Sequence, residues 1–120
     1  MNGSGVALAS ITGDIQVERY ISARKAWRML SVTTSGSQTI NAAWQEGQTA
    51  NSTTPAGYGI QITGPNFPNG FDLYTATPAL KTFDAATNSW TTVTSTLTPF
   101  TDKAAYMVFI RGDRTVNSFG

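Results

Sequence analysis

The chain contains no cysteine and no histidine, and only 12% of its residues are charged. The absence of cysteine excludes a disulfide framework and thiol chemistry. The absence of histidine removes the side chain that most often serves in general acid–base catalysis. The sequence also has no apolar run of about 18 residues, the length that a membrane-spanning helix requires. These absences argue against an enzyme and against insertion into a membrane.

Threonine and aromatic residues are abundant in place of charged ones. The 120 residues include 19 threonines, 10 serines, 6 phenylalanines, 4 tyrosines and 3 tryptophans. Threonine favours strands because its branched Cβ packs well on a pleated surface, and the aromatics are sufficient for the core of one domain. The net charge of +1 predicts no nucleic-acid partner.

Short strand-like stretches alternate with turn signals along the chain. Residues 14–21 alternate in the manner of a strand, and residues 26–33 carry apolar groups on both faces, which predicts a central strand. Residues 80–93 read as a hairpin, and residues 104–110 form the most apolar run, which predicts a buried central strand. Residues 58–63, 71–74 and 115–118 are expected to form further short strands.

One helix is expected, over residues 40–46, with Thr39 as its cap and Gly47 as its end. About eight short strands and this helix predict an all-β fold, namely an antiparallel β-sandwich or jelly roll with one short helix. Residues 1–13 are expected to be a flexible N-terminal segment, and residues 14–120 one β-sandwich domain that is truncated at its C-terminal strand. The core is expected to contain Trp27, Leu30, Tyr106, Val108 and Ile110.

Several segments, in this order and spacing, resemble a β module of large secreted or cell-surface proteins of Bacteroidetes-type bacteria. They are GDIQVERYI at 13–21, AWRML at 26–30, INAAWQEG at 40–47, GYGIQITG at 57–64, GFD at 70–72 and YMVFIRGDR at 106–114. Proteins that carry this module are gliding- or adhesin-like and leave the cell by the type IX route. The resemblance implies an extracellular or cell-surface location and implies no chemistry for individual residues.

Aromatic side chains are the first candidate binding residues. Trp27, Trp44, Trp90 and Tyr58 could form a platform on which sugar rings stack. Packing into the core is the competing interpretation, because aromatics dominate the cores of small domains. Exposure of two or more of the tryptophans on one face would favour the platform.

Arg111, Gly112 and Asp113 form a second candidate, the tripeptide that integrin ligands display. The alternative is a turn after a buried strand, in which Gly112 supplies a positive φ and Asp113 bonds to its own backbone. The turn is the preferred interpretation, because glycine and aspartate are common turn residues.

The sequence therefore predicts a non-catalytic extracellular β module of a bacterial surface protein, which serves adhesion or structural spacing. The alternative is a carbohydrate-binding module that uses exposed tryptophan and tyrosine. No catalytic residue, no metal ligand and no cofactor is predicted, since the few carboxylates show no spacing typical of a catalytic pair or a calcium loop. The expected partners are polysaccharide or other surface proteins.

Overall fold

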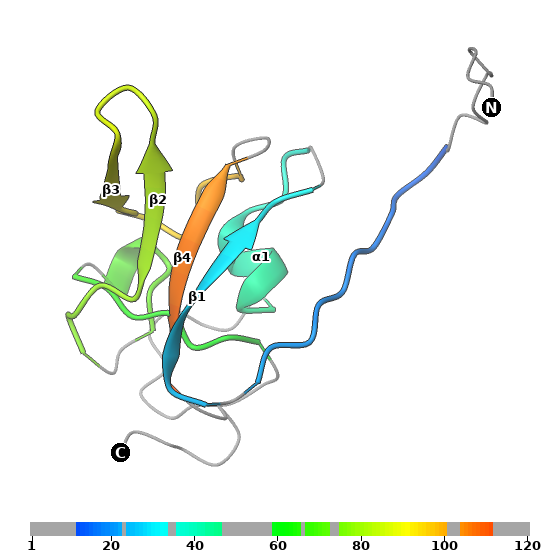
Figure 1. Cartoon of the computed structure of the whole chain (residues 1–120). Helices are drawn as coiled ribbons and strands as arrows, with labels where there is room; N and C mark the ends of the chain where they lie inside the picture. The colour runs from blue at the N-terminus through cyan, green and yellow to red at the C-terminus, as the bar shows by residue number, and fades with distance from the viewer. Residues whose placement is uncertain are drawn as a thin grey trace.

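The computed structural model describes residues 12–22, 24–33, 36–46, 59–65, 67–72, 75–100 and 104–111. Its elements in chain order are β1 (Ala26–Ser31), helix α1 (Ile40–Trp44), the 3₁₀ helix η1 (Phe67–Asn69), β2 (Leu80–Asp84), β3 (Ser89–Thr92) and β4 (Ala105–Ile110) (Figure 1). The prediction of an all-β fold with one short helix is confirmed.

The strands form one antiparallel sheet in the order β1-β4-β2-β3. β4 occupies a central position, as its apolar run predicted. β1 lies at an edge of the sheet and pairs only with β4 among the described elements, so the prediction of a central strand over residues 26–33 is wrong within this part of the chain. The described residues form a single sheet, and the second sheet of the predicted sandwich is not found among them.

Other expected strands take different forms. Residues 14–21 are extended but pair with no described strand. Residues 58–63 and 71–74, where described, meet only at an isolated parallel bridge between Thr63 and Asp72. Residues 115–118 lie outside the described residues. An extended stretch becomes a strand only when a neighbouring backbone supplies its hydrogen bonds, and alternation along the sequence does not report such a neighbour.

The β2–β3 hairpin forms where the sequence predicted it. The Asp84 carboxylate caps the turn by accepting hydrogen bonds from Ala86 N at 2.9 Å and Thr87 Oγ1 at 3.0 Å. Asn88 completes the turn with φ +51°, a conformation that asparagine tolerates better than most residues. The two strands of the hairpin pair from Lys81 opposite Thr92 to Asp84 opposite Ser89.

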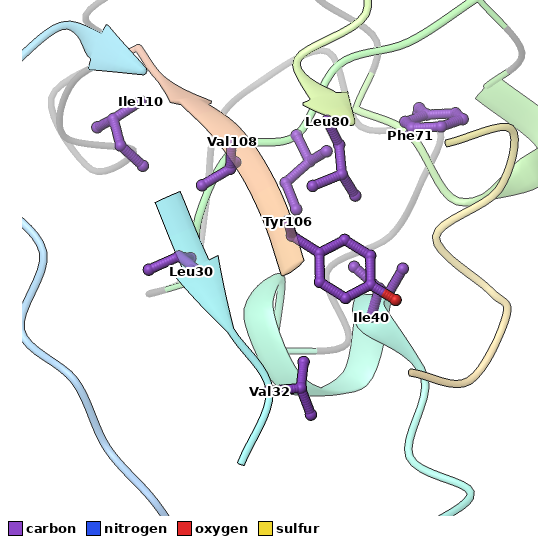
Figure 2. Packing of buried hydrophobic residues seen from close by; sticks show 9 residues of the cluster. Leu30, Val32, Ile40, Phe71, Leu80, Tyr106, Val108 and Ile110 are labelled. Atoms are coloured by element: carbon purple, nitrogen blue, oxygen red, sulfur yellow. The ribbon is translucent and has the colours of Figure 1, made fainter. Parts of the chain in front are cut away.

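The core lies on one side of the sheet, where α1 and the segments before β2 cover it (Figure 2). Its largest buried members are Leu30, Val32, Ile40, Ile62, Phe71, Leu80, Tyr106, Val108 and Ile110. The prediction of Leu30, Tyr106, Val108 and Ile110 as core is confirmed. The prediction of Trp27 is wrong, because its side chain is 43% exposed. Positions 27 and 30 of one strand point to opposite faces and cannot both enter one core.

Helix α1 begins as the sequence indicates. Thr39 Oγ1 accepts a hydrogen bond from Ala42 N at 3.1 Å, which satisfies a backbone donor of the first turn. Ile40 is buried against the sheet, and Trp44 packs its ring against Tyr106 at 5.4 Å. No helix of the described residues has the length and apolar character to cross a membrane.

A buried polar cluster joins the end of α1 to the chain at residues 59–72. Gln45 is fully buried, and its Nε2 donates to Gly70 O and to Asp72 Oδ2, both at 3.0 Å. The same Asp72 oxygen accepts from Ile62 N at 2.7 Å. Gly59 lies so close that a Cβ there would come within 2.4 Å of the Gln45 backbone. Residue 59 must therefore be glycine for this contact to form.

We expect Leu80→Ala to lower the free energy of unfolding by about 2–5 kcal/mol, because truncating this fully buried side chain of β2 leaves a cavity in the core. Leu97, which is 51% exposed, is the matched control, and Leu97→Ala should change stability by about 0.5 kcal/mol or less. Urea unfolding of both variants measures the difference. Equal losses would contradict the placement of the core.

We expect Asp72→Ala to destabilise the fold by about 1–3 kcal/mol for each buried N–H group that it leaves unpaired, namely that of Ile62 and the one N–H of Gln45 Nε2 that does not bond Gly70 O. Asp14→Ala removes an exposed carboxylate outside the cluster and should cost about 0.5 kcal/mol or less. Thermal and urea unfolding would test the pair. An Asp72→Ala variant as stable as Asp14→Ala would show that the cluster contributes little.

Candidate functional site

The sheet has a second face that no other described helix or strand covers. Residues directly opposite in an antiparallel pair share a face, and alternate residues of a strand point to opposite faces. The pairs Trp27–Phe109, Met29–Met107, Lys81–Met107 and Phe83–Trp90 therefore place seven side chains together. We call these residues the open face: Trp27, Met29, Lys81, Phe83, Trp90, Met107 and Phe109. Trp27, Met29 and Phe83 are exposed, and the other four are half-buried.

The open face carries two aromatic pairs on opposite sides of a methionine row. Trp27 and Phe109 have ring centroids 5.4 Å apart at an interplanar angle of 59°. Phe83 and Trp90 have the same centroid distance at 67°. Met29 and Met107 lie between the pairs. Each ring is thus held by a neighbour, which fixes the aromatic surface before any ligand arrives.

A hollow of about 620 Å³ adjoins the first of these pairs. Trp27 and Phe109 line it together with Thr75, Thr77, Pro78 and Arg111. It is a shallow hollow open to solvent, and it combines apolar rings with a few polar groups, as ligand-binding sites do.

Hydrogen bonds hold the polar rim of the hollow in place. Arg111 Nη2 donates to Thr63 Oγ1 at 3.0 Å, and Thr63 Oγ1 donates to Thr77 O at 2.7 Å. Thr77 N donates to Thr75 Oγ1 at 3.2 Å. The guanidinium and the threonine hydroxyls of the rim are thereby oriented relative to the rings.

The charges on the open face are positive. Lys81 Nζ lies 5.5 Å from the Trp27 ring centroid, and Arg111 Cζ lies 5.4 Å from the Phe109 centroid. Both distances fit cation–π contacts. The described carboxylates lie elsewhere, in the extended segment, after α1, in the buried cluster and in the hairpin turn; they are Asp14, Glu18, Glu46, Asp72 and Asp84.

The structure brings together some of the predicted site residues and separates others. Trp27 and Trp90 share the open face. Trp44 lies on the core side, where its ring packs at 4.8 Å from Phe100. Arg111 is bound to Thr63 at the edge of the hollow, which anchors the first residue of the tripeptide to the fold. Tyr58, Gly112 and Asp113 lie outside the described residues.

Met29, Lys81, Phe83, Met107 and Phe109 complete the open face and were not among the predicted site residues. A signal for them exists in the sequence, because in residues 26–31 and 105–110 apolar side chains occur on both faces of the strand. From the sequence, both faces were expected to be buried, as in a central strand. The same pattern also arises when one face is buried and the other is an apolar surface.

Two of the described carboxylates are held by hydrogen bonds within the fold. Asp72 is buried and accepts hydrogen bonds from Ile62 N and Gln45 Nε2. The Ala86 backbone N–H and the Thr87 hydroxyl lower the pKa of Asp84 below its ordinary value. Within the described ranges, no three side chains of the metal-binding types gather at one place. The arrangement is suited to binding through rings and hydroxyls.

Comparison with known proteins gives no further guidance: no family model, no curated protein and no solved structure matches this chain. The resemblance to surface modules of Bacteroidetes-type bacteria therefore stays a prediction. Any functional argument must begin from the open face itself.

We expect the carboxyl of Asp84 to titrate, in NMR, below the value of about 3.9 that is usual for aspartate. A depressed folded pKa contributes stability above the unfolded pKa, and this contribution is lost as pH falls through the folded value, below about pH 4. Thr87→Ala removes one donor and should raise the midpoint. A midpoint that Thr87→Ala leaves unchanged would contradict the assigned hydrogen bond.

Proposed function

We propose that this chain is a non-catalytic adhesion module of a bacterial surface or secreted protein and that it binds carbohydrate through the open face. The observation that supports this proposal is the hollow beside Trp27 and Phe109, where fixed aromatic rings meet oriented threonine hydroxyls and a guanidinium.

This combination matches the chemistry of a sugar ring. A pyranose presents C–H groups on its face, which pack on an aromatic surface, and hydroxyl groups around its edge, which need hydrogen-bond partners. Trp27 and Phe109 supply the surface. Thr75, Thr77 and Arg111 lie at the rim, within the same hollow. The second aromatic pair, Phe83 and Trp90, extends the surface across the sheet, as an oligosaccharide would require.

The sign of the charge suggests which carbohydrates bind best. Lys81 and Arg111 both approach the rings of the open face, and the described carboxylates lie elsewhere. Acidic glycans, which carry carboxylates, would be attracted to this face, and the attraction would weaken as salt concentration rises. Neutral glycans would rely on stacking and hydroxyl contacts alone.

Structural spacing is the second candidate function. The Thr-rich strands, the low charge and the resemblance to surface modules favour it equally. The two candidates separate on one measurement, because a spacer has no specific ligand. A glycan array without hits would support spacing, while hits that depend on Trp27 would support adhesion through carbohydrate.

We expect Trp27→Ala to weaken binding to the best glycan by about 10- to 100-fold, because a central tryptophan anchor is worth about 1.4–2.8 kcal/mol. Isothermal titration calorimetry on the folded variants measures the affinity. Tyr20→Ala is the matched control: it removes an exposed aromatic that is not on the open face, and it should leave affinity unchanged. Equal affinities of the two variants would contradict this site.

A further inference from the structure

Two backbone stretches have no neighbouring strand among the described residues. Residues 12–22 run away from the body in an extended conformation (blue in Figure 1), and no backbone hydrogen bond joins them to another described residue. Ile15 and Val17 are each 56% exposed. At the sheet edge, β1 pairs with β4 on one side and with no described strand on the other. An unpaired strand and an unpaired edge are both open to further pairing.

The sequence of β1 leaves part of its outer edge open to pairing. Residues 26–33 carry apolar groups on both faces, one of them in the core and the other on the open face. Edge strands are usually protected by charge, proline or a bulge. Within β1 the one charged residue is Arg28, on the same face as Leu30, and the last three residues, Met29, Leu30 and Ser31, carry neither charge nor proline. The edge is therefore unprotected beyond Arg28, and an additional strand could pair with it there.

A hollow of about 1550 Å³ lies between the two unpaired stretches. Residues 13–21 line it on one side, and residues 30–33 of the β1 region, Trp44, Ile60 and Phe100 line it on the other. The segment stays apart from β1 across this hollow (Figure 1). A further strand in this space would touch the segment and the last residues of β1, Leu30 and Ser31.

We propose that the occupant is the segment 14–21 of a second copy of this chain, inserted reciprocally. In such a dimer the segment of each copy lies between β1 and the segment of the other copy. The strand order across the junction becomes β1, partner segment, own segment, partner β1. This arrangement has the two-fold symmetry that most homodimers adopt. It satisfies both unpaired stretches of each copy in one step, without any change in the core.

The charges of the segment fit this pairing. Glu18 and Arg19 are adjacent and opposite in sign. When two copies of the segment pair antiparallel about an axis between these residues, Glu18 of each copy lies opposite Arg19 of the other. Opposite charges at directly facing positions stabilise a strand pair, whereas like charges destabilise it. The open face is less suited to self-association, because it would bring Lys81 of both copies together.

The test is the mass of the full-length chain in light scattering after gel filtration, over a series of concentrations. The wild type should run as a dimer of about twice 12.8 kDa. Val17→Pro should run as a monomer, because proline removes a ladder hydrogen bond and is excluded from the middle of a sheet. Val17→Ile, which keeps the N–H group and the strand propensity, should stay a dimer. Circular dichroism should show the same fold for all three.

Hydrogen exchange gives an independent measurement. Amides of residues 14–21 and of β1 should be protected in the wild type at high concentration, and this protection should be lost in Val17→Pro. A wild type that remains monomeric at all concentrations would overturn the proposal. So would a Val17→Pro variant that still dimerises, because its interface would then lie elsewhere. Glycan binding through Trp27 should survive in Val17→Pro, which keeps this test separate from that of the proposed function.

Discussion

The fold depends most on one buried contact, that between Gln45 and Asp72. It connects the end of α1 to a stretch of chain that forms no regular strand, and the Asp72 carboxylate also accepts a hydrogen bond from the backbone of that stretch at Ile62. A buried carboxylate is costly unless its oxygens accept hydrogen bonds, so the contact forms only when both segments are in place. Ile40, Ile62 and Phe71 belong to the segments that this contact joins, and all three are buried in the core. The polar contact and the apolar packing therefore hold the covering layer together.

Both faces of the sheet carry apolar side chains, but only one of them is buried. Tyr106, Val108 and Ile110 of β4 enter the core, while Met107 and Phe109 of the same strand face outward. A core of this kind needs only one apolar face per strand. The apolar residues on the other face are therefore not needed to form the core within the described part of the chain. Their rings are nonetheless paired and adjoin a polar rim, and this is why a binding role is a better explanation than chance.

Much of the fold could be predicted from the sequence, and the reasons for success and failure are physical. Local signals worked: Thr39 capped the helix, the turn residues after Asp84 made the hairpin, and the apolar run of β4 took a central position. Signals that depend on a distant neighbour failed. Alternation predicted strands at 14–21 and at 58–63, but pairing requires a second backbone that the pattern does not specify. The candidate site could be predicted from the sequence only in part. Trp27 and Trp90 could be named, whereas their joining with Phe109 and Lys81 depends on the pairing register of three strands.

The central place of β4 has a consequence for how the chain reaches this fold. β1 and the β2–β3 hairpin touch only through β4, which is the last of the described strands to be synthesised. Until β4 leaves the ribosome, β1 has no partner, and the hairpin alone is at best marginally stable. The sheet thus cannot assemble during translation of the first 104 residues. Its contacts are long-range, which slows folding. The chain is therefore expected to stay incompletely folded until its last described strand has been synthesised.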